Sequence, residues 1–312
     1  MSICRQGCSR TLGPIQRISM EEVQNIILRY KDLDFEKEVS TLDGLVAFST
    51  TFYKDVSEIY DVVTRVRNIE RNPTGFDFND AAILGLLVRI WKILKEIVVY
   101  YEKNNADIIS LLDRQVIEAA VTAKYLLMKG DKAIIDYRKC SYKDRINMVL
   151  DSQKNPEFWQ TKTGERLLRS IKAKLETEGW DLNSFDEQKK NMWRLQGKSF
   201  YKIFTEVEPE AYYKHLYGIP SEGIHGSWND SMDYHLQKND DGTFSVYPYY
   251  QAVDIRFVTP ILRLCHAPFI LWLKRIDAED EYLFKALEWT RRMNVQLYNS
   301  FEAAYESYTN TT

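Results

Sequence analysis

Apolar residues recur at three- and four-residue intervals along most of the chain, which is the pattern of amphipathic helices. The longest run covers residues 42–69, and further runs cover about 79–104, 107–129 and 131–150. Gly130 is expected to end the third of these helices, because glycine readily adopts the left-handed conformation that closes a helix. Long helices with short connections are typical of a helical bundle.

The second half of the chain is more polar, and a loop is expected at residues 213–235 because Pro220, Gly223 and Gly226 interrupt the periodicity. Asn239-Asp240-Asp241-Gly242 separates two short alternating stretches and predicts one small β-hairpin near 233–248. The fold class is therefore all-α, a multi-helix bundle with this single hairpin. The other helices are expected at about 163–178, 185–195, 199–207, 210–217, 252–276 and 278–308, with Pro260 and Pro268 kinking the helix at 252–276.

Residues 1–17 show no periodicity and predict a flexible N-terminal arm. Ser19 and Glu22 have the spacing of a capping box, which predicts a helix start after the arm. Residues 18–312 are expected to form a single helical domain, with sub-layers at 18–155 and 156–312. Because 45% of the residues are hydrophobic and 13% aromatic, the chain has enough apolar material for a large core.

The charged residues nearly balance, with 42 basic and 45 acidic side chains and a net charge of -3. They are interspersed along the helices, so charge alone gives no support to non-specific nucleic-acid binding. The four cysteines fit a reducing compartment. The sequence shows no signal peptide and no uncharged transmembrane stretch, so we expect a cytoplasmic protein without a membrane partner.

Three of the four histidines lie in 213-YKHLYGIPSEGIHGSWNDSMDYH-235, among serines, carboxylates and glycines. Histidine suits proton transfer near neutral pH, so His225 is a candidate general acid or base. The alternative is that His225 simply satisfies a helix end. His225, Asp230, Asp233 and His235 are competent metal ligands, but their spacing matches no known metal pattern, and Cys4 and Cys8 lack a second pair. We therefore predict no metal site and no cofactor.

Arg114 and Glu118 lie one helical turn apart in the apolar stretch 112-LDRQVIEAAVTAKYLL-127. A salt bridge explains this pair most simply. The functional alternative is that Arg114 binds an anion such as a phosphate while Glu118 orients the guanidinium. No phosphate loop, dinucleotide-binding glycine motif or zinc-protease motif occurs in the chain. The tryptophans lie mostly at helical positions, where core packing is the usual role.

The segments 114-RQVIEAAVTAKYL-126, 137-YRKCSYKDR-145 and 213-YKHLYGIPSEGIHG-226, together with Trp193, resemble the bacterial family catalogued as domain of unknown function 5677. The resemblance covers about residues 80–235. It implies an all-helical cytoplasmic bacterial protein and no established activity. Its characteristic polar positions correspond to Arg114, Glu118, Tyr217, Ser221 and His225.

The same pattern is distantly similar to helical nuclease-type domains of prokaryotic toxin and phage-defence systems, which cleave RNA without metal. Those domains carry an RxxxxH motif, and none of the four histidines here has an arginine at that distance before it. Cleavage of RNA therefore requires Arg114 and His225 to meet from distant segments.

Three functions remain open from the sequence. The first is a module that binds a small ligand, a nucleotide or a partner protein through Arg114, Tyr217, Ser221 and His225. The second is a metal-independent ribonuclease-like enzyme that uses His225, Arg114 and Glu118. The third is a structural scaffold. Homodimerisation is a further expectation, as is a role in a bacterial stress or phage-defence system.

Overall fold

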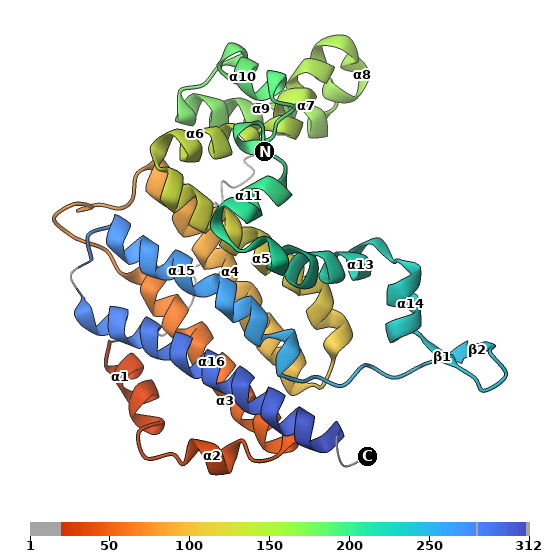
Figure 1. The fold of residues 1–312 in the computed structure, drawn as a ribbon. Helices are drawn as coiled ribbons and strands as arrows, with labels where there is room; N and C mark the ends of the chain where they lie inside the picture. Colours follow the sequence, from red (N-terminus) through yellow and green to blue (C-terminus); the bar gives the residue numbers. More distant parts are fainter. Residues whose placement is uncertain (1–19, 279, 310–312) are drawn as a thin grey trace, which may run out of the picture.

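Five long helices pack against one another in a closed ring and form the main body of the protein (Figure 1). In the computed structural model, which describes residues 20–278 and 280–309, each of these helices contacts the next, and the last contacts the first. The predicted all-α bundle is thus confirmed. In the order of the ring, the helices are α3 (Leu42–Arg65), α4 (Phe78–Glu102), α5 (Ala106–Lys129), α15 (Thr259–Arg275) and α16 (Glu281–Thr309).

Short polar side chains start the first three of these helices by accepting a hydrogen bond from a free backbone N–H group. Thr41 accepts from the N–H of Gly44 at 3.0 Å, Asp77 from that of Asp80 at 2.8 Å, and Asn105 from that of Ile108 at 3.3 Å. Gly130 ends α5 with a φ of 77°, as the sequence predicted.

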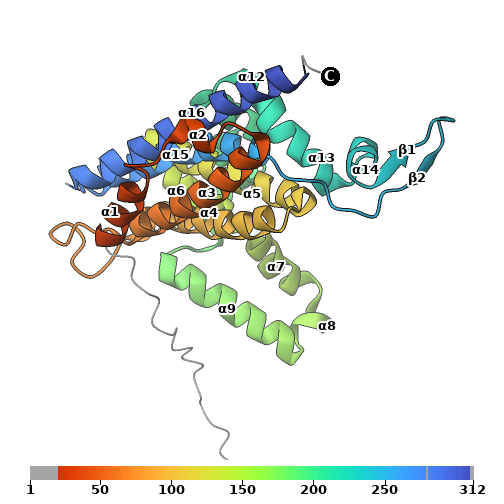
Figure 2. The ribbon, with the colours of Figure 1, turned by 90° about the horizontal axis from the view of Figure 1, so that it is seen from below.

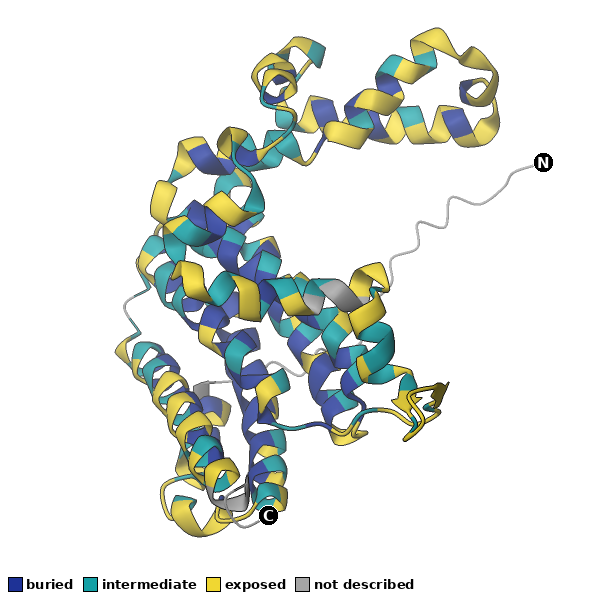
Figure 3. Ribbon diagram, turned by 45° about the vertical axis from the view of Figure 1, so that its right-hand side comes forward, coloured by how far each residue is buried: buried dark blue, intermediate teal, exposed yellow. Residues whose placement is uncertain are grey.

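Many residues of the bundle helices are buried (Figure 3), and the largest fully buried side chains are aromatic. Tyr60 of α3 and Phe269 of α15 stack at 4.0 Å between ring centroids, and Trp272 is fully buried. Each large apolar side chain buried in this way contributes about 1.5–3 kcal/mol to folding. Residues Ile255–Arg275 are long and apolar enough to span a membrane, but 61% of the apolar window is buried inside the bundle, as in a core helix.

A second, smaller cluster of buried residues lies outside the ring and includes Tyr142, Ile146 and Phe185. The prediction of one helix over 131–150 is wrong, because the chain turns at Ser141 and Tyr142, and Tyr142 packs into this second cluster. Figure 2 shows that α7 (Lys143–Lys154), α8 (Pro156–Trp159) and α9 (Lys162–Glu178) extend away from the ring. Helix α6 (Asp131–Cys140) packs on α4 and α5 and leads from the ring to this region, and α10 (Asp186–Lys190) comes after α9 in the chain.

The loop predicted at 213–235 is also wrong, because this segment is almost entirely helical. It comprises a π-helical turn at Tyr213–Gly218, α13 (Ile219–His225) and α14 (Trp228–Tyr234). Pro220 lies within this continuous helical stretch, two residues after the end of the π-helical turn. Gly226, with a φ of 57°, follows α13 and separates it from α14.

The predicted hairpin is confirmed. Strand β1 (Leu236–Lys238) pairs antiparallel with β2 (Phe244–Val246), with Gln237 opposite Ser245, and the hairpin projects from the bundle (Figure 1).

Three other predicted elements differ at their ends. The helix expected at 42–69 ends at Arg65, because the backbone of Val66 is extended. The helix expected at 252–276 begins only at Thr259, so Pro260 lies in its first turn and kinks nothing, whereas Pro268 lies inside the helix. The helix expected at 185–195 ends at Lys190, because Met192 and Trp193 adopt a left-handed backbone.

Ser19, Cys4, Cys8 and the arm at 1–17 lie outside the described residues. The remaining elements are α1 (Met20–Arg29), α2 (Phe35–Glu38), α11 (Phe200–Val207), α12 (Glu210–Tyr212) and 3-10 turns at Leu182–Phe185, Leu195–Gly197 and Ile255–Phe257.

One carboxylate at the start of α4 is buried and paired with arginines. The side chain of Asp80 is 1% exposed, and its Oδ1 accepts from Arg275 Nε at 2.6 Å. Its Oδ2 accepts from Arg71 Nη2 at 3.2 Å. Arg275 also pairs with Asp131 at 2.7 Å, so this arginine joins α15 to the starts of α4 and α6.

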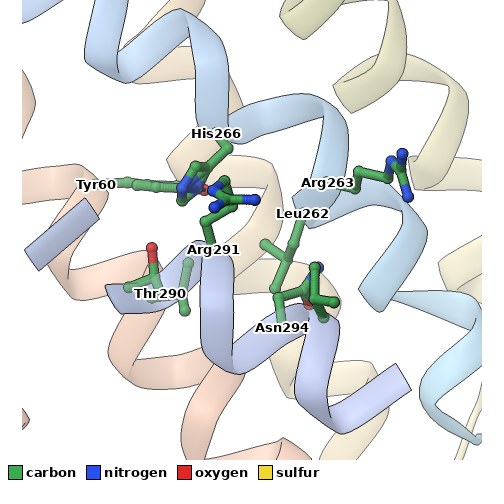
Figure 4. Close-up of a pocket in the computed structure, with 9 residues that line it drawn as sticks. Tyr60, Leu262, Arg263, His266, Thr290, Arg291 and Asn294 are labelled. Atoms are coloured by element: carbon green, nitrogen blue, oxygen red, sulfur yellow. Dashed lines mark hydrogen bonds between the residues drawn. The ribbon is translucent and has the colours of Figure 1, made fainter. Parts of the chain in front are cut away.

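A small cavity of about 20 Å³ lies between α3, α15 and α16 and is lined by His266, Tyr60, Thr290, Arg291 and other residues (Figure 4). His266 is 4% exposed, its Nδ1 lies 3.4 Å from the Tyr60 hydroxyl, and its Nε2 has no hydrogen-bond partner among the described residues. Burial disfavours the charged imidazolium and lowers the pKa of His266 to about 4.

We expect this imidazole to make the protein sensitive to acid. Between pH 6.5 and 4 the unfolded chain binds a proton at His266 that the folded chain does not, so stability is lost as the pH falls through this window. Urea unfolding at pH 7.5 and 4.5 should show a loss about 2–3 kcal/mol larger for the wild type than for His266→Gln. The variant His215→Gln, which removes an exposed imidazole, should keep the wild-type loss. Equal losses for wild type and His266→Gln would refute the prediction.

Candidate functional site

The site lies where α13 and the π-helical turn before it pack against α5 (Figure 1). Arg114 and Glu118 lie one turn apart on α5. Tyr217 comes from the π-helical turn, and His225 is the last residue of α13. These four residues are called the Arg114 cluster below.

The guanidinium of Arg114 contacts all three other members of the cluster. Its Nε donates to Glu118 Oε1 at 2.9 Å, and its Nη1 lies 3.2 Å from His225 Nε2. Its Cζ lies 4.9 Å from the centre of the Tyr217 ring, a cation–π distance. The Tyr217 hydroxyl donates to Glu118 Oε1 at 2.7 Å, which closes the network. The structure therefore joins Arg114 and His225, which are 111 residues apart in the sequence.

The contact with Arg114 selects one form of His225. A guanidinium only donates hydrogen bonds, so the Nε2 that faces it acts as the acceptor. A neutral imidazole with Nε2 as acceptor carries its proton on Nδ1. His225 is exposed, so solvent and ligands reach this ring.

The network also fixes the charge states of Arg114 and Tyr217. Partial burial lowers the pKa of Arg114, but the hydrogen bond that Arg114 donates to Glu118 and the nearby charges outweigh it, so the pKa is raised overall. Burial, and then the hydrogen bond to Glu118, raises the pKa of Tyr217 well above its usual value. At neutral pH the cluster thus presents a cationic guanidinium and a neutral phenol.

Ser221 lies on the same helix as His225 but takes part in a different contact. Its Oγ donates to the backbone carbonyl of Tyr217 at 2.6 Å, one turn earlier. No described contact joins it to Arg114. Ser221 thus supports the helix that carries the cluster.

Among the other acidic and histidine residues of the 213–235 segment, the described structure pairs His235 with Asp230. His235 Nε2 lies 3.6 Å from Asp230 Oδ2. Among residues 20–278 and 280–309, no group of three or more histidine, cysteine or carboxylate side chains is arranged to hold a metal ion.

Exposed aromatic residues that follow the cluster in the sequence are a feature that the sequence analysis missed. Trp228, expected to be a core residue, is 59% exposed, and its ring contacts that of Phe244 in the hairpin at 5.7 Å between centroids. Tyr249 and Tyr250, just after the hairpin, are 70% and 66% exposed. The polar residues on either side of Trp228 in the sequence were the signal that could have predicted its exposure.

A family model described as a family of unknown function (DUF5677) matches residues 80–243, which is more than half of the chain. The chain belongs to this family. The matched range of the DUF5677 protein includes nearly all of α4, all of α5 and every member of the Arg114 cluster, whereas α3, α15 and α16 lie outside it. Neither a curated protein nor a solved structure matches the chain.

Proposed function

We propose that this DUF5677 protein binds a phosphate-containing ligand at the Arg114 cluster. The observation that supports this is the arrangement of Arg114, whose guanidinium is held by Glu118, Tyr217 and His225 while its side chain stays 23% exposed. A guanidinium has five N–H donors, so donors remain for a ligand beyond those that the cluster uses. A cation oriented in advance loses little freedom when it binds, which favours affinity.

The charge of the cluster favours a phosphodiester. Arg114 is its one cationic side chain, and the carboxylate of Glu118 lies beside it. The second charge of a terminal phosphate would be attracted by Arg114 and repelled by this carboxylate, whereas the single charge of a phosphodiester matches the single cation of the cluster. A dinucleoside monophosphate such as UpU is therefore the preferred probe, and the mononucleotide UMP is its comparison.

Replacing Arg114 by alanine should weaken the binding of UpU by about 10- to 100-fold, because hydrogen bonds to charged groups contribute about 1.5–3 kcal/mol. Isothermal titration calorimetry measures this effect. Arg89→Ala is the matched control, because Arg89 is an exposed arginine of α4 that bonds to Gln115 of α5 at 2.8 Å and does not belong to the cluster. Equal binding by wild type and Arg114→Ala, or equal weakening in both variants, would count against the proposal.

A second candidate is the cleavage of RNA without metal, and the 3.2 Å contact between Arg114 and His225 favours it. A phosphate bound to Arg114 would replace His225 at Nη1 and free Nε2 as a general base. His225 would then take the proton of the ribose 2′-hydroxyl, whose oxygen bonds to phosphorus while the bond to the 5′-oxygen breaks. The leaving 5′-oxygen takes a proton from water, and the imidazolium of His225 returns its proton to the solvent. Arg114 would stabilise the charge on the phosphate, with Glu118 or Tyr217 assisting. The products are a 2′,3′-cyclic phosphate and a 5′-hydroxyl.

The cellular setting that we propose is the cytoplasm of a bacterium, in a stress or phage-defence system. The resemblance of the motifs to bacterial proteins supports a bacterial origin. The four cysteines fit a reducing compartment and so support the cytoplasm. A homodimer remains a prediction, which light scattering coupled to size-exclusion chromatography tests. A purely structural role for the Arg114 cluster predicts that Arg114→Ala lowers stability and changes no binding.

A further inference from the structure

A polar cavity of about 450 Å³ lies between α6 and α10, outside the Arg114 cluster. Its volume is within the range of small-molecule binding sites. Four residues of α6, spaced so that they share one face of the helix, line one wall of the cavity. Residues of α10 and of the segment that follows it line the other wall. The lining residues are Lys132, Ile135, Asp136, Lys139, Glu187, Gln188, Asn191 and Gln196.

Gln188 has a buried amide whose oxygen is unpaired. The residue is 2% exposed, and its Nε2 donates to Asp136 Oδ1 at 2.7 Å. This bond fixes the orientation of the amide, because a flip would place two oxygens against each other. Oε1 then has no partner among the described residues. Buried carbonyl oxygens are nearly always hydrogen-bonded, so this oxygen requires an N–H or O–H donor from elsewhere.

The cavity carries charges of both signs. Lys132 and Glu187 are exposed, and Lys139 is half-buried with its Nζ 5.8 Å from the centre of the Trp180 ring. The carboxylate of Asp136 already accepts from Gln188 and, at 2.5 Å, from the N–H of Gln196. Glu187 and the Gln188 oxygen therefore suit an ammonium group, while Lys132 and Lys139 suit a carboxylate. Ile135, 39% exposed, offers apolar surface between them.

The backbone beside the cavity is strained. Met192, Trp193 and Gln196 have φ values of 54°, 58° and 49°, in the left-handed region that residues other than glycine rarely adopt. Such residues gather at ligand sites and switch regions. Because Gln188 Oε1 is closed to solvent, a ligand reaches it only when the atoms that cover it move.

We propose that the cavity between α6 and α10 binds a small zwitterion, either a free amino acid or a dipeptide. Its ammonium group donates to Gln188 Oε1 and pairs with Glu187, and its carboxylate pairs with Lys132 and Lys139. Its apolar side chain contacts Ile135. This site is independent of the Arg114 cluster.

The test is a calorimetric titration of the full chain with leucine and with glycyl-leucine, which distinguishes the two sources of the zwitterion. At least one should bind, and acetylation of its amine or amidation of its carboxylate should weaken binding by about tenfold or more. Lys132→Glu should weaken binding similarly. Lys190→Glu is the matched control, because Lys190 is an exposed lysine of α10 that does not line the cavity. It should change the affinity by less than about twofold, and so should Arg114→Ala.

Three results would overturn the proposal. The first is that neither compound binds at about 10 mM, a concentration that detects even weak sites. The second is that the two lysine variants weaken binding equally, which would indicate a general charge effect. The third is that Arg114→Ala abolishes binding, which would assign the ligand to the Arg114 cluster.

Discussion

Replacing Arg275 by methionine is expected to lower the free energy of unfolding by about 3–5 kcal/mol. Arg275 is the closer of the two arginines that pair with Asp80, whose side chain is 1% exposed. Without Arg275, the carboxylate stays buried with only Arg71, at 3.2 Å, to offset its charge. A buried charge without adequate pairing is among the most costly defects in a folded protein. Urea unfolding monitored by circular dichroism measures the effect.

Lys274→Met is the control for this change. Lys274 precedes Arg275 on α15 and is exposed, so its replacement removes the same charge without exposing a buried carboxylate. It should alter stability by no more than about 0.5 kcal/mol. If Arg275→Met were as mild as Lys274→Met, the buried ion pair would not hold α15 to the starts of α4 and α6.

Replacing His225 by alanine is expected to lower RNA cleavage by about 10²- to 10⁴-fold, the range for loss of a general acid or base. The prediction belongs to the second candidate function, in which Nε2 of His225 accepts a proton after the phosphate has taken its place on Arg114. Gel analysis of a mixed RNA substrate, incubated with purified protein and a metal chelator, measures the cleavage.

His215→Ala is the matched control, because His215 is exposed in the same segment but has no described contact with Arg114. It should cleave RNA as the wild type does. Equal cleavage by His225→Ala and wild type would remove His225 as the catalyst. If the wild type itself cleaves no RNA, the enzymatic candidate is excluded and the binding proposal stands.

The long helices were predictable because their apolar spacing and their caps are local properties. Arg114 and Glu118 were placed correctly on one turn of α5 for the same reason, since four residues separate them in the chain. The hairpin followed from the Asn-Asp-Asp-Gly turn between alternating stretches.

The segment at 213–235 was mispredicted because local rules gave the wrong weight to proline and glycine. Pro220 lies within a continuous helical stretch, and the residues before it include a π-helical turn, which no simple periodicity describes. The break at Ser141 and Tyr142 depends on the second core, which local sequence does not show.

The meeting of Arg114 and His225 required the packing of α13 on α5. Hydrophobic periodicity indicates which face of each helix is buried but not which other helix covers that face. From the sequence, this contact could therefore be given only as a condition for joint function. The resemblance to the family pointed to the same residues without their distances. Their geometry is what the structure adds.

The most direct test of ligand binding at the Arg114 cluster is a nitrogen-15 NMR titration with UpU, observing the side-chain Nε–H of Arg114. In the free protein this N–H is held by Glu118 at 2.9 Å, which should slow its exchange with water and keep its signal visible. Binding at the cluster predicts a saturable shift of this signal together with the ring signals of His225. If UpU binds the protein while both sets of signals stay unchanged, the Arg114 cluster is not the binding site.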